Sequence, residues 1–194
     1  MNEHEAESLF EYALGLYRIE VVLFEVIAPL LQLHNASSRS ISEGQIQFAQ
    51  SWVRMKLFIV FQQIPLKPFL AKVITVAPYN KKHDQSEIEI LLYSIFLKLR
   101  GFEVYYLGHV QESALQQLIQ RIQPLFIFSV QTEETAFIQK MKGWLDESDS
   151  KVKLGILGNH SEDLSSEIFI GNDMRNWMEW LNHYFHKNHM AINI

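Results

Sequence analysis

VITVAPYNKKHDQSEIEILLYSIFLKLRGFEVYYLG, residues 73–108, is the stretch that decides the fold, because it predicts a strand, a polar loop, a helix and a second strand. The first strand, Lys72 to Ala77, is a β-branched run that ends at Pro78. Gly101 ends a helix whose apolar residues recur at steps of three and four: Ile88, Leu91, Leu92, Ile95 and Leu99. In open α/β sheets, ligands bind outside the carboxyl ends of the strands, so the loop that holds His83 is a candidate functional loop.

The chain after this unit continues the alternation of strands and helices. We predict further strands at 125–130, 153–157 and 168–170, and helices at 113–123 and 132–145. Ser113 and Gln116 have capping-box spacing, and Asp173 predicts the start of a final helix that runs to about Tyr184. Its apolar side chains are expected to pack on the sheet: Trp177, Trp180, Leu181 and Tyr184. The pattern predicts the α/β class, with a mostly parallel, five-stranded sheet covered by helices on both faces.

The part of the chain before residue 65 predicts helices only. We expect helices at 5–14 and 18–33, with a kink at Pro29, and a third after Ser42, which has capping-box spacing with Gln45. The third helix is predicted to be buried, and its core residues are Ile46, Ala49, Val53, Leu57 and Val60. Pro65 and Pro68 bracket a short connector, so we place the domain boundary there: a helical bundle over 1–68 and a sheet domain over 69–194.

The composition excludes several function classes. Of the 194 residues, 48% are hydrophobic and 20% are charged, which is typical of a globular protein and excludes a disordered chain. A net charge of -5 argues against binding DNA through the chain's own field, so DNA would be reached only through another domain or a partner protein. The absence of cysteine excludes a disulfide framework. The acidic start and the lack of a long apolar run predict a cytoplasmic protein without a membrane partner.

Three short motifs and their spacing resemble a known family. The residues Lys81-Lys82-His83-Asp84-Gln85-Ser86, Ser129-Val130-Gln131 and Gly158-Asn159 stand where that family has an acid-x-His-x-x-Gly loop, Ser-x-Leu and Gly-Gly. Forty-two residues separate Ser86 from Ser129, and twenty-six separate Gln131 from Gly158. The helical part adds Pro29-Leu30-Leu31 and QIQFAQSWVRMKL, residues 45–57. The chain therefore resembles the cobalamin-binding module of light- and cobalamin-responsive MerR-type transcriptional regulators, itself similar to the cobalamin domains of methionine synthase and the corrinoid mutases.

This resemblance implies a Rossmann-like, flavodoxin-like sheet domain that holds cobalamin against the helical bundle. It implies His83 as the lower axial ligand of cobalt, with further contacts from Asp84, Ser86, Ser129, Gln131, Gly158 and Asn159. The ordinary alternatives are a solvated loop histidine for His83 and local backbone bonding for Ser129. The implied activity is that of a regulatory sensor rather than an enzyme, since a corrinoid mutase or methyltransferase needs a substrate domain.

The motif also departs from the family pattern at several positions. Lys81 replaces the acid that supports the histidine, although Asp84 offers another oxygen acceptor, and a metal-bound histidine normally donates its second N–H to such an acceptor. Ser86, Gln131 and Asn159 replace Gly, Leu and the second Gly of the pattern. In the bundle, the residues that cover the upper cobalt face in the light-sensing members are replaced by Ala36 and Ile46-Gln47.

Two function classes follow from this pattern. In the first, the chain is a corrinoid-binding sensor that controls transcription through an attached or partner DNA-binding protein. In the second, it is a cofactor-free relative that acts as a protein-interaction module. Both leave light response, the upper axial ligand and homo-oligomerisation open.

Overall fold

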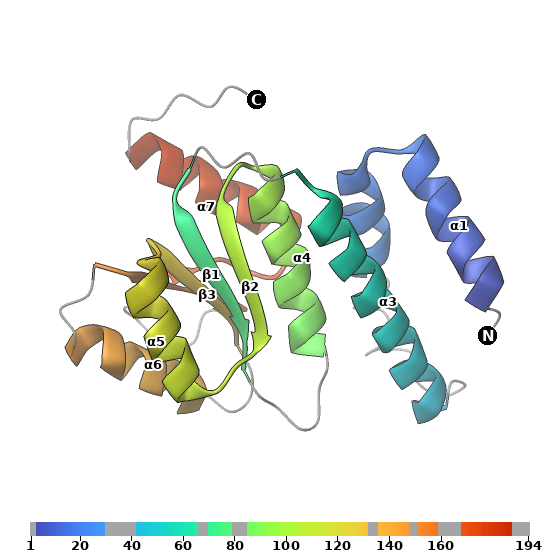
Figure 1. Cartoon of the computed structure of the whole chain (residues 1–194). Coiled ribbons are helices and arrows are strands. Elements are labelled where there is room, and N and C mark those ends of the chain that lie inside the picture. The colour runs from blue at the N-terminus through green and yellow to red at the C-terminus, as the bar shows by residue number, and fades with distance from the viewer. Residues whose placement is uncertain are drawn as a thin grey trace.

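The computed structural model describes residues 3–29, 42–65, 70–78, 85–131, 136–147, 151–158 and 168–187. Its centre is a parallel sheet with the strand order β2-β1-β3-β4-β5 (Figure 1). The four longer strands are β1 (Lys72–Ala77), β2 (Glu103–His109), β3 (Phe126–Val130) and β4 (Lys153–Leu157), and β5 (Ile168–Phe169) adds two residues beyond β4. All four strand pairs are parallel. This is the doubly wound, flavodoxin-like order, and the chain reverses its direction of winding between β1 and β3.

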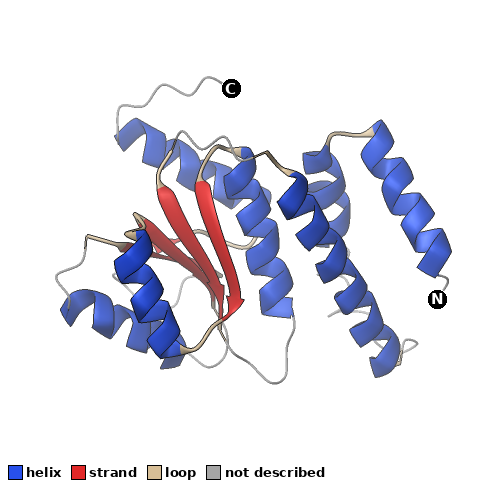
Figure 2. Ribbon diagram, in the orientation of Figure 1, coloured by secondary structure: helices blue, strands red, loops and turns tan. Residues whose placement is uncertain are grey.

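Helices cover both faces of this sheet (Figure 2). On one face lie α4 (Gln85–Leu99) and α7 (Met174–Lys187), and on the other lie α5 (Glu112–Ile122) and α6 (Ala136–Glu147). The strands are buried on both faces, which explains why β3 is buried at every position and does not alternate between apolar and polar residues; Ser129 is its one polar residue. The predicted α/β class with a parallel sheet is confirmed, and the fifth strand is present only as the two residues of β5. The expected packing of the last helix against the sheet core is also confirmed, through Trp177, Trp180, Leu181 and Tyr184.

The N-terminal helices extend the core on the α4 side. They are α1 (Glu3–Leu16), the π-helix η1 (Val21–Ile27) and α3 (Glu43–Gln63). Ser42 caps α3 with the predicted capping box, in which Gln45 Oε1 accepts from the Ser42 N–H at 2.9 Å. Leu23 and Phe24 of η1 and Leu57 and Val60 of α3 belong to the same buried cluster as α4. The order α4, α3, α1 is visible from the sheet outward in Figure 1.

Polar contacts from the end of α4 and the turn after it hold these helices in place. Lys98 Nζ donates to the Phe61 carbonyl oxygen at 2.7 Å, near the end of α3. Arg100 Nη1 pairs with Glu20 Oε1 at 2.6 Å, just before η1. Lysine and arginine side chains near exposed helix carbonyls and carboxylates satisfy groups that would otherwise need water.

Two sequence-based expectations were wrong in detail. The helix expected to begin at Ser113 begins at Glu112, with Gln111 as its N-cap and no side-chain capping bond, because the backbone is still extended at Gln111 and already helical beyond it. The third helix is not buried as a whole: Leu57 and Val60 are buried, but the opposite side is exposed. The caps at Ser42 and Asp173 are confirmed, the latter by a 2.9 Å bond from the Asn176 N–H to Asp173 Oδ1. No helix in the described ranges is long and apolar enough to cross a membrane.

Candidate ligand-binding site

The predicted site residues that the structure describes gather at the carboxyl edge of the sheet. β1, β3 and β4 are parallel neighbours, so their ends at Ala77, Val130 and Leu157 lie on one edge. Ser129, Gln131 and Gly158 stand at the ends of β3 and β4. Because α4 follows β1, its first turn begins at the same edge with Gln85 and Ser86. The predictions for His83, Asp84 and Asn159 fall outside the described residues and stay predictions.

Ser129 carries an unusual polar group for a central strand. Its neighbours in register are Val76 on β1 and Ile156 on β4, and the side chain is fully buried. Its Oγ has no hydrogen-bond partner among the described residues. A buried hydroxyl without a partner is costly, by about 1–3 kcal/mol, so an orphan hydroxyl at the ligand-binding edge of such a sheet marks a place where a polar group would be accepted.

Gln131 and Gly158 lie against each other at the ends of β3 and β4. The Gln131 N–H donates to the Leu157 carbonyl oxygen at 2.7 Å, which extends the ladder by one residue. Gly158 has φ +149°, and a Cβ built on it would lie 2.6 Å from Gln131 Cβ and 2.7 Å from Gln131 Oε1. The glycine is therefore needed here for the approach of the Gln131 side chain, which fills the space above it.

Ser86 lies in the first turn of α4 and is 5% exposed. The residue that the resemblance expects as glycine is thus a buried serine inside the helix. The next residue, Glu87, is the centre of a polar cluster that sequence reasoning missed.

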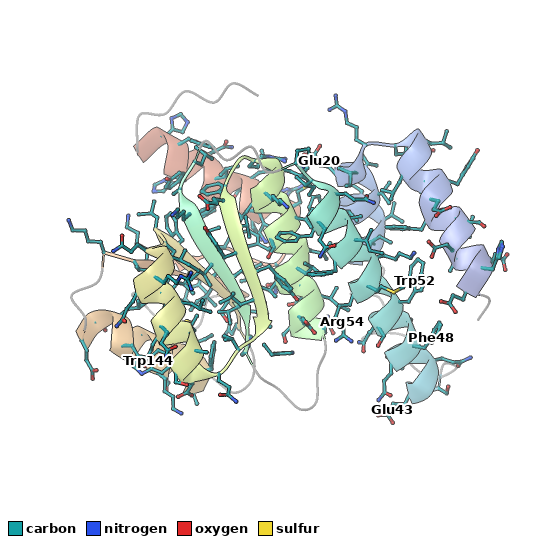
Figure 3. The ribbon with its side chains drawn as sticks, in the orientation of Figure 1. Glu20, Glu43, Phe48, Trp52, Arg54 and Trp144 are labelled. Atoms are coloured by element: carbon teal, nitrogen blue, oxygen red, sulfur yellow. The ribbon has the colours of Figure 1, made fainter. Side chains whose placement is uncertain are left out.

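The cluster joins three elements at the carboxyl edge. Glu87 Oε2 accepts from Arg54 Nη1 of α3 at 2.8 Å, and Glu87 Oε1 accepts from the Tyr106 hydroxyl of β2 at 3.1 Å. His109 Nε2, at the end of β2, lies 3.9 Å from Glu87 Oε2. A bulge at Leu107 shifts the β1–β2 register and places Gly108, at φ +58°, beside this carboxylate. In Figure 3, Arg54 leaves α3 toward α4, whereas Trp52 leaves it toward α1.

Burial and charge keep the Tyr106 hydroxyl of this cluster protonated. Burial, the negative charge of Glu87 and the hydrogen bond to it raise the pKa of Tyr106 well above its usual value, so Tyr106 stays a donor. Glu87 therefore receives hydrogen bonds from both the bundle and the sheet. No single sequence motif predicts the cluster, because its residues come from three elements; the acidic first turn of α4 at Glu87 was the one local signal.

The bundle positions named by the resemblance differ in burial. Ile46 is half-buried and Gln47 is exposed, both in the first turns of α3, and Ala36 lies outside the described residues. Trp52 contacts the Phe10 ring edge-on at 5.7 Å, so it packs between α3 and α1. Among the described residues, no three histidine or carboxylate side chains are grouped to hold a metal ion.

Comparison with known proteins yields a fold and no family. No protein-family model matches the chain, and no curated protein matches its sequence. A novel cobalamin-binding protein from Desulfitobacterium hafniense DCB-2 superposes with a TM-score of 0.50 at 12% identity, covering 94% of this chain and 92% of that one. The methanol:cobalamin methyltransferase complex MtaBC from Methanosarcina barkeri gives a TM-score of 0.50 at 13% identity, covering 86% of this chain and 67% of that one. The chain thus has the fold of cobalamin-binding proteins: N-terminal helices followed by a flavodoxin-like parallel sheet.

Proposed function

We propose that this chain is a corrinoid-binding module that holds cobalamin at the carboxyl edge of its sheet, next to the N-terminal helices. The observation that carries the proposal is the buried hydroxyl of Ser129 at that edge, which has no partner among the described residues, in a chain whose fold matches a cobalamin-binding protein over nearly the full length of both. The edge is also where this class of sheet binds ligands.

Two features of the described residues favour binding of such a ligand, and one side chain stands in its way. Ser129 offers a buried donor and acceptor, and Arg54 with Glu87 fixes α3 against the first turn of α4. Gln131 stands over Gly158, where the resemblance places part of the cofactor. Its amide end belongs to a flexible side chain, so rotation about χ2 and χ3 moves the amide without moving the strand.

The proposed roles follow from these positions. His83 would hold cobalt from below, with Asp84 as an acceptor for its second N–H. Ser86, Ser129, Gln131, Gly158 and Asn159 would contact the corrinoid. When bound, the cofactor would supply a metal centre with an exchangeable upper ligand. We propose regulation rather than catalysis as the use of this site: occupancy would alter a surface presented to another protein, including an attached or partner DNA-binding protein.

A visible-absorption titration tests the proposal. Purified chain is mixed with hydroxocobalamin or adenosylcobalamin, and the free cofactor is removed by gel filtration. Co-elution with a shifted spectrum is expected, and the shift should be lost in His83→Ala, because replacing the lower ligand changes the cobalt spectrum. Failure of both corrinoids to co-elute with the wild-type chain contradicts the proposal.

A second candidate is a cofactor-free interaction module, and the placement of Gln131 favours it. The side chain already fills the space above Gly158, as a residue would in a relative that no longer admits a cofactor. Gln131→Ala separates the two functions. If Gln131 only obstructs the site, the alanine variant gains corrinoid binding that the wild type lacks; if neither protein binds, the interaction module is the better account.

A further inference from the structure

Large apolar side chains are unevenly exposed on this molecule. In the part of the chain that the structure describes, every exposed large hydrophobic residue belongs to the N-terminal helices and the turn after α1: Leu9, Tyr12, Leu16, Tyr17, Val26, Phe48, Met55, Phe58 and Ile59. The sheet and its four helices expose none among the described residues. The exposed parts of these side chains therefore form apolar surface on the N-terminal helices of the described structure.

Four of these residues share one side of α3. Phe48, Met55, Phe58 and Ile59 are 44%, 47%, 41% and 40% exposed. At 100° per residue they fall, with Gly44, Gln47, Ser51 and Gln62, within about one third of the helix circumference. All eight residues are exposed, and none carries a charge. We call these eight residues the α3 face.

The two basic residues of α3, Arg54 and Lys56, lie on the two flanks of this face and are both paired within the chain. On one flank, Arg54 pairs with Glu87 of α4 at 2.8 Å. On the other, Lys56 pairs with Glu7 of α1. These two basic side chains thus point away from the α3 face and into the chain's own packing, and the remaining charge of α3, Glu43, lies in its first turn outside the eight residues. Depletion of charge with enrichment of aromatic residues and methionine is the composition of an interface core.

We propose that the α3 face is a self-association surface, on which the α3 helix of a second copy packs antiparallel about a two-fold axis near Met55. A two-fold contact brings each residue near the axis against its own copy, so any charge there meets the same charge. The α3 face satisfies this condition because it has none. The exposed side of α1 does not, since α1 carries four glutamates and no lysine or arginine. Antiparallel packing also opposes the two helix dipoles favourably.

The size of the face sets the strength of the contact. Stable interfaces use about 20–30 residues a side, and eight residues of one helix fall well short of that number. The dimer is therefore weak and concentration-dependent. Because Gln47 at one end of the face is also a position that the resemblance places over the cobalt, the dimer is tested on the cofactor-free protein.

Sedimentation equilibrium from about 1 µM to about 300 µM brackets a micromolar Kd and measures the association directly. We expect the wild type to pass from monomer toward dimer over this range. Met55→Glu should weaken association at least about tenfold, because two carboxylates would face each other at the axis. Leu9→Glu is the matched control: its side chain is exposed on α1, and it should leave the constant unchanged.

Mixing two variants then tests the two-fold geometry itself. Met55→Lys alone should also weaken association, whereas Met55→Glu mixed with Met55→Lys should form a heterodimer tighter than either variant with itself. Circular dichroism verifies that all variants fold. The proposal is overturned by a wild type that stays monomeric at the highest concentration, by a dimer that Met55→Glu leaves intact, or by a mixture no tighter than its parents.

Discussion

Removing the Ser129 hydroxyl should make the cofactor-free protein more stable, which is the reverse of what most core substitutions do. Ser129→Ala deletes a fully buried Oγ that has no hydrogen-bond partner among the described residues. An unsatisfied buried polar group costs about 1–3 kcal/mol. Two smaller terms oppose this gain. Removing one oxygen leaves a void of about 10 Å³, which costs about 0.2 kcal/mol at about 24 cal/mol per Å³. The lower strand preference of alanine costs roughly a further few tenths of a kcal/mol.

The net expectation is a gain of about 1 kcal/mol, or a rise in Tm of roughly 2–4 °C for a chain of this size. Urea unfolding followed by circular dichroism measures it without cofactor. The same variant should bind corrinoid less tightly if Ser129 meets the ligand. A site that costs stability while it aids binding is typical of functional positions.

Ser94→Ala is the matched control for this measurement. Ser94 is equally buried, but its Oγ lies 2.6 Å from the Ile90 carbonyl oxygen and 2.7 Å from Thr75 Oγ1, so it can donate to the first and accept from the second. Its removal should destabilise the protein by about 1 kcal/mol, because it leaves Thr75 without its partner. Equal losses of stability in both alanine variants would refute the reasoning, since they would mean that Ser129 is as well satisfied as Ser94.

Three further expectations follow from the same elements. Burial raises the pKa of the Glu89 carboxyl in the folded protein above 4.5, its value in the unfolded chain. The protein is therefore not penalised by Glu89 below about pH 4.5, where the carboxyl is neutral in both states, and it loses stability as the pH rises through the pKa of the folded state. Glu89→Gln should stabilise the protein at about pH 7 and give no gain at about pH 4 in thermal melts. A double-mutant cycle of Arg54→Met and Glu87→Gln should yield a coupling free energy of about 1 kcal/mol. The coupling should shrink with salt, because the two side chains are 33% and 18% exposed. Zero coupling at low salt would mean that the pair does not fasten α3 to α4. Gly158→Ala should lower the free energy of unfolding by roughly 1–3 kcal/mol, because of φ +149° and the close Gln131 side chain. Gly143→Ala is the control: it lies inside α6 with open space around it and should raise the free energy of unfolding by about 0.5–1 kcal/mol. A Gly158→Ala variant as stable as the wild type contradicts the geometry described above.

Local signals predicted the elements of this protein well. The β-branched run at 72–77, the helical spacing from Ile88 to Leu99 and the stop at Gly101 each depend on near neighbours in the chain, and each is confirmed. The caps at Ser42 and Asp173 succeeded for the same reason. The predicted cap at Ser113 failed because capping-box spacing describes the side chains and does not fix the residue at which the backbone leaves extended geometry.

The sequence by itself therefore determined the alternation of strands and helices, and with it a parallel sheet whose carboxyl edge carries Ser129, Gln131 and Gly158. Only the tertiary structure decided that Ser129 has no hydrogen-bond partner within the described ranges and that Gln131 covers Gly158. The Glu87 cluster and the uncharged α3 face also required it. The physical reason is that secondary structure follows from periodicity and backbone preference over a few residues, whereas burial and hydrogen-bond satisfaction depend on which distant segments come into contact.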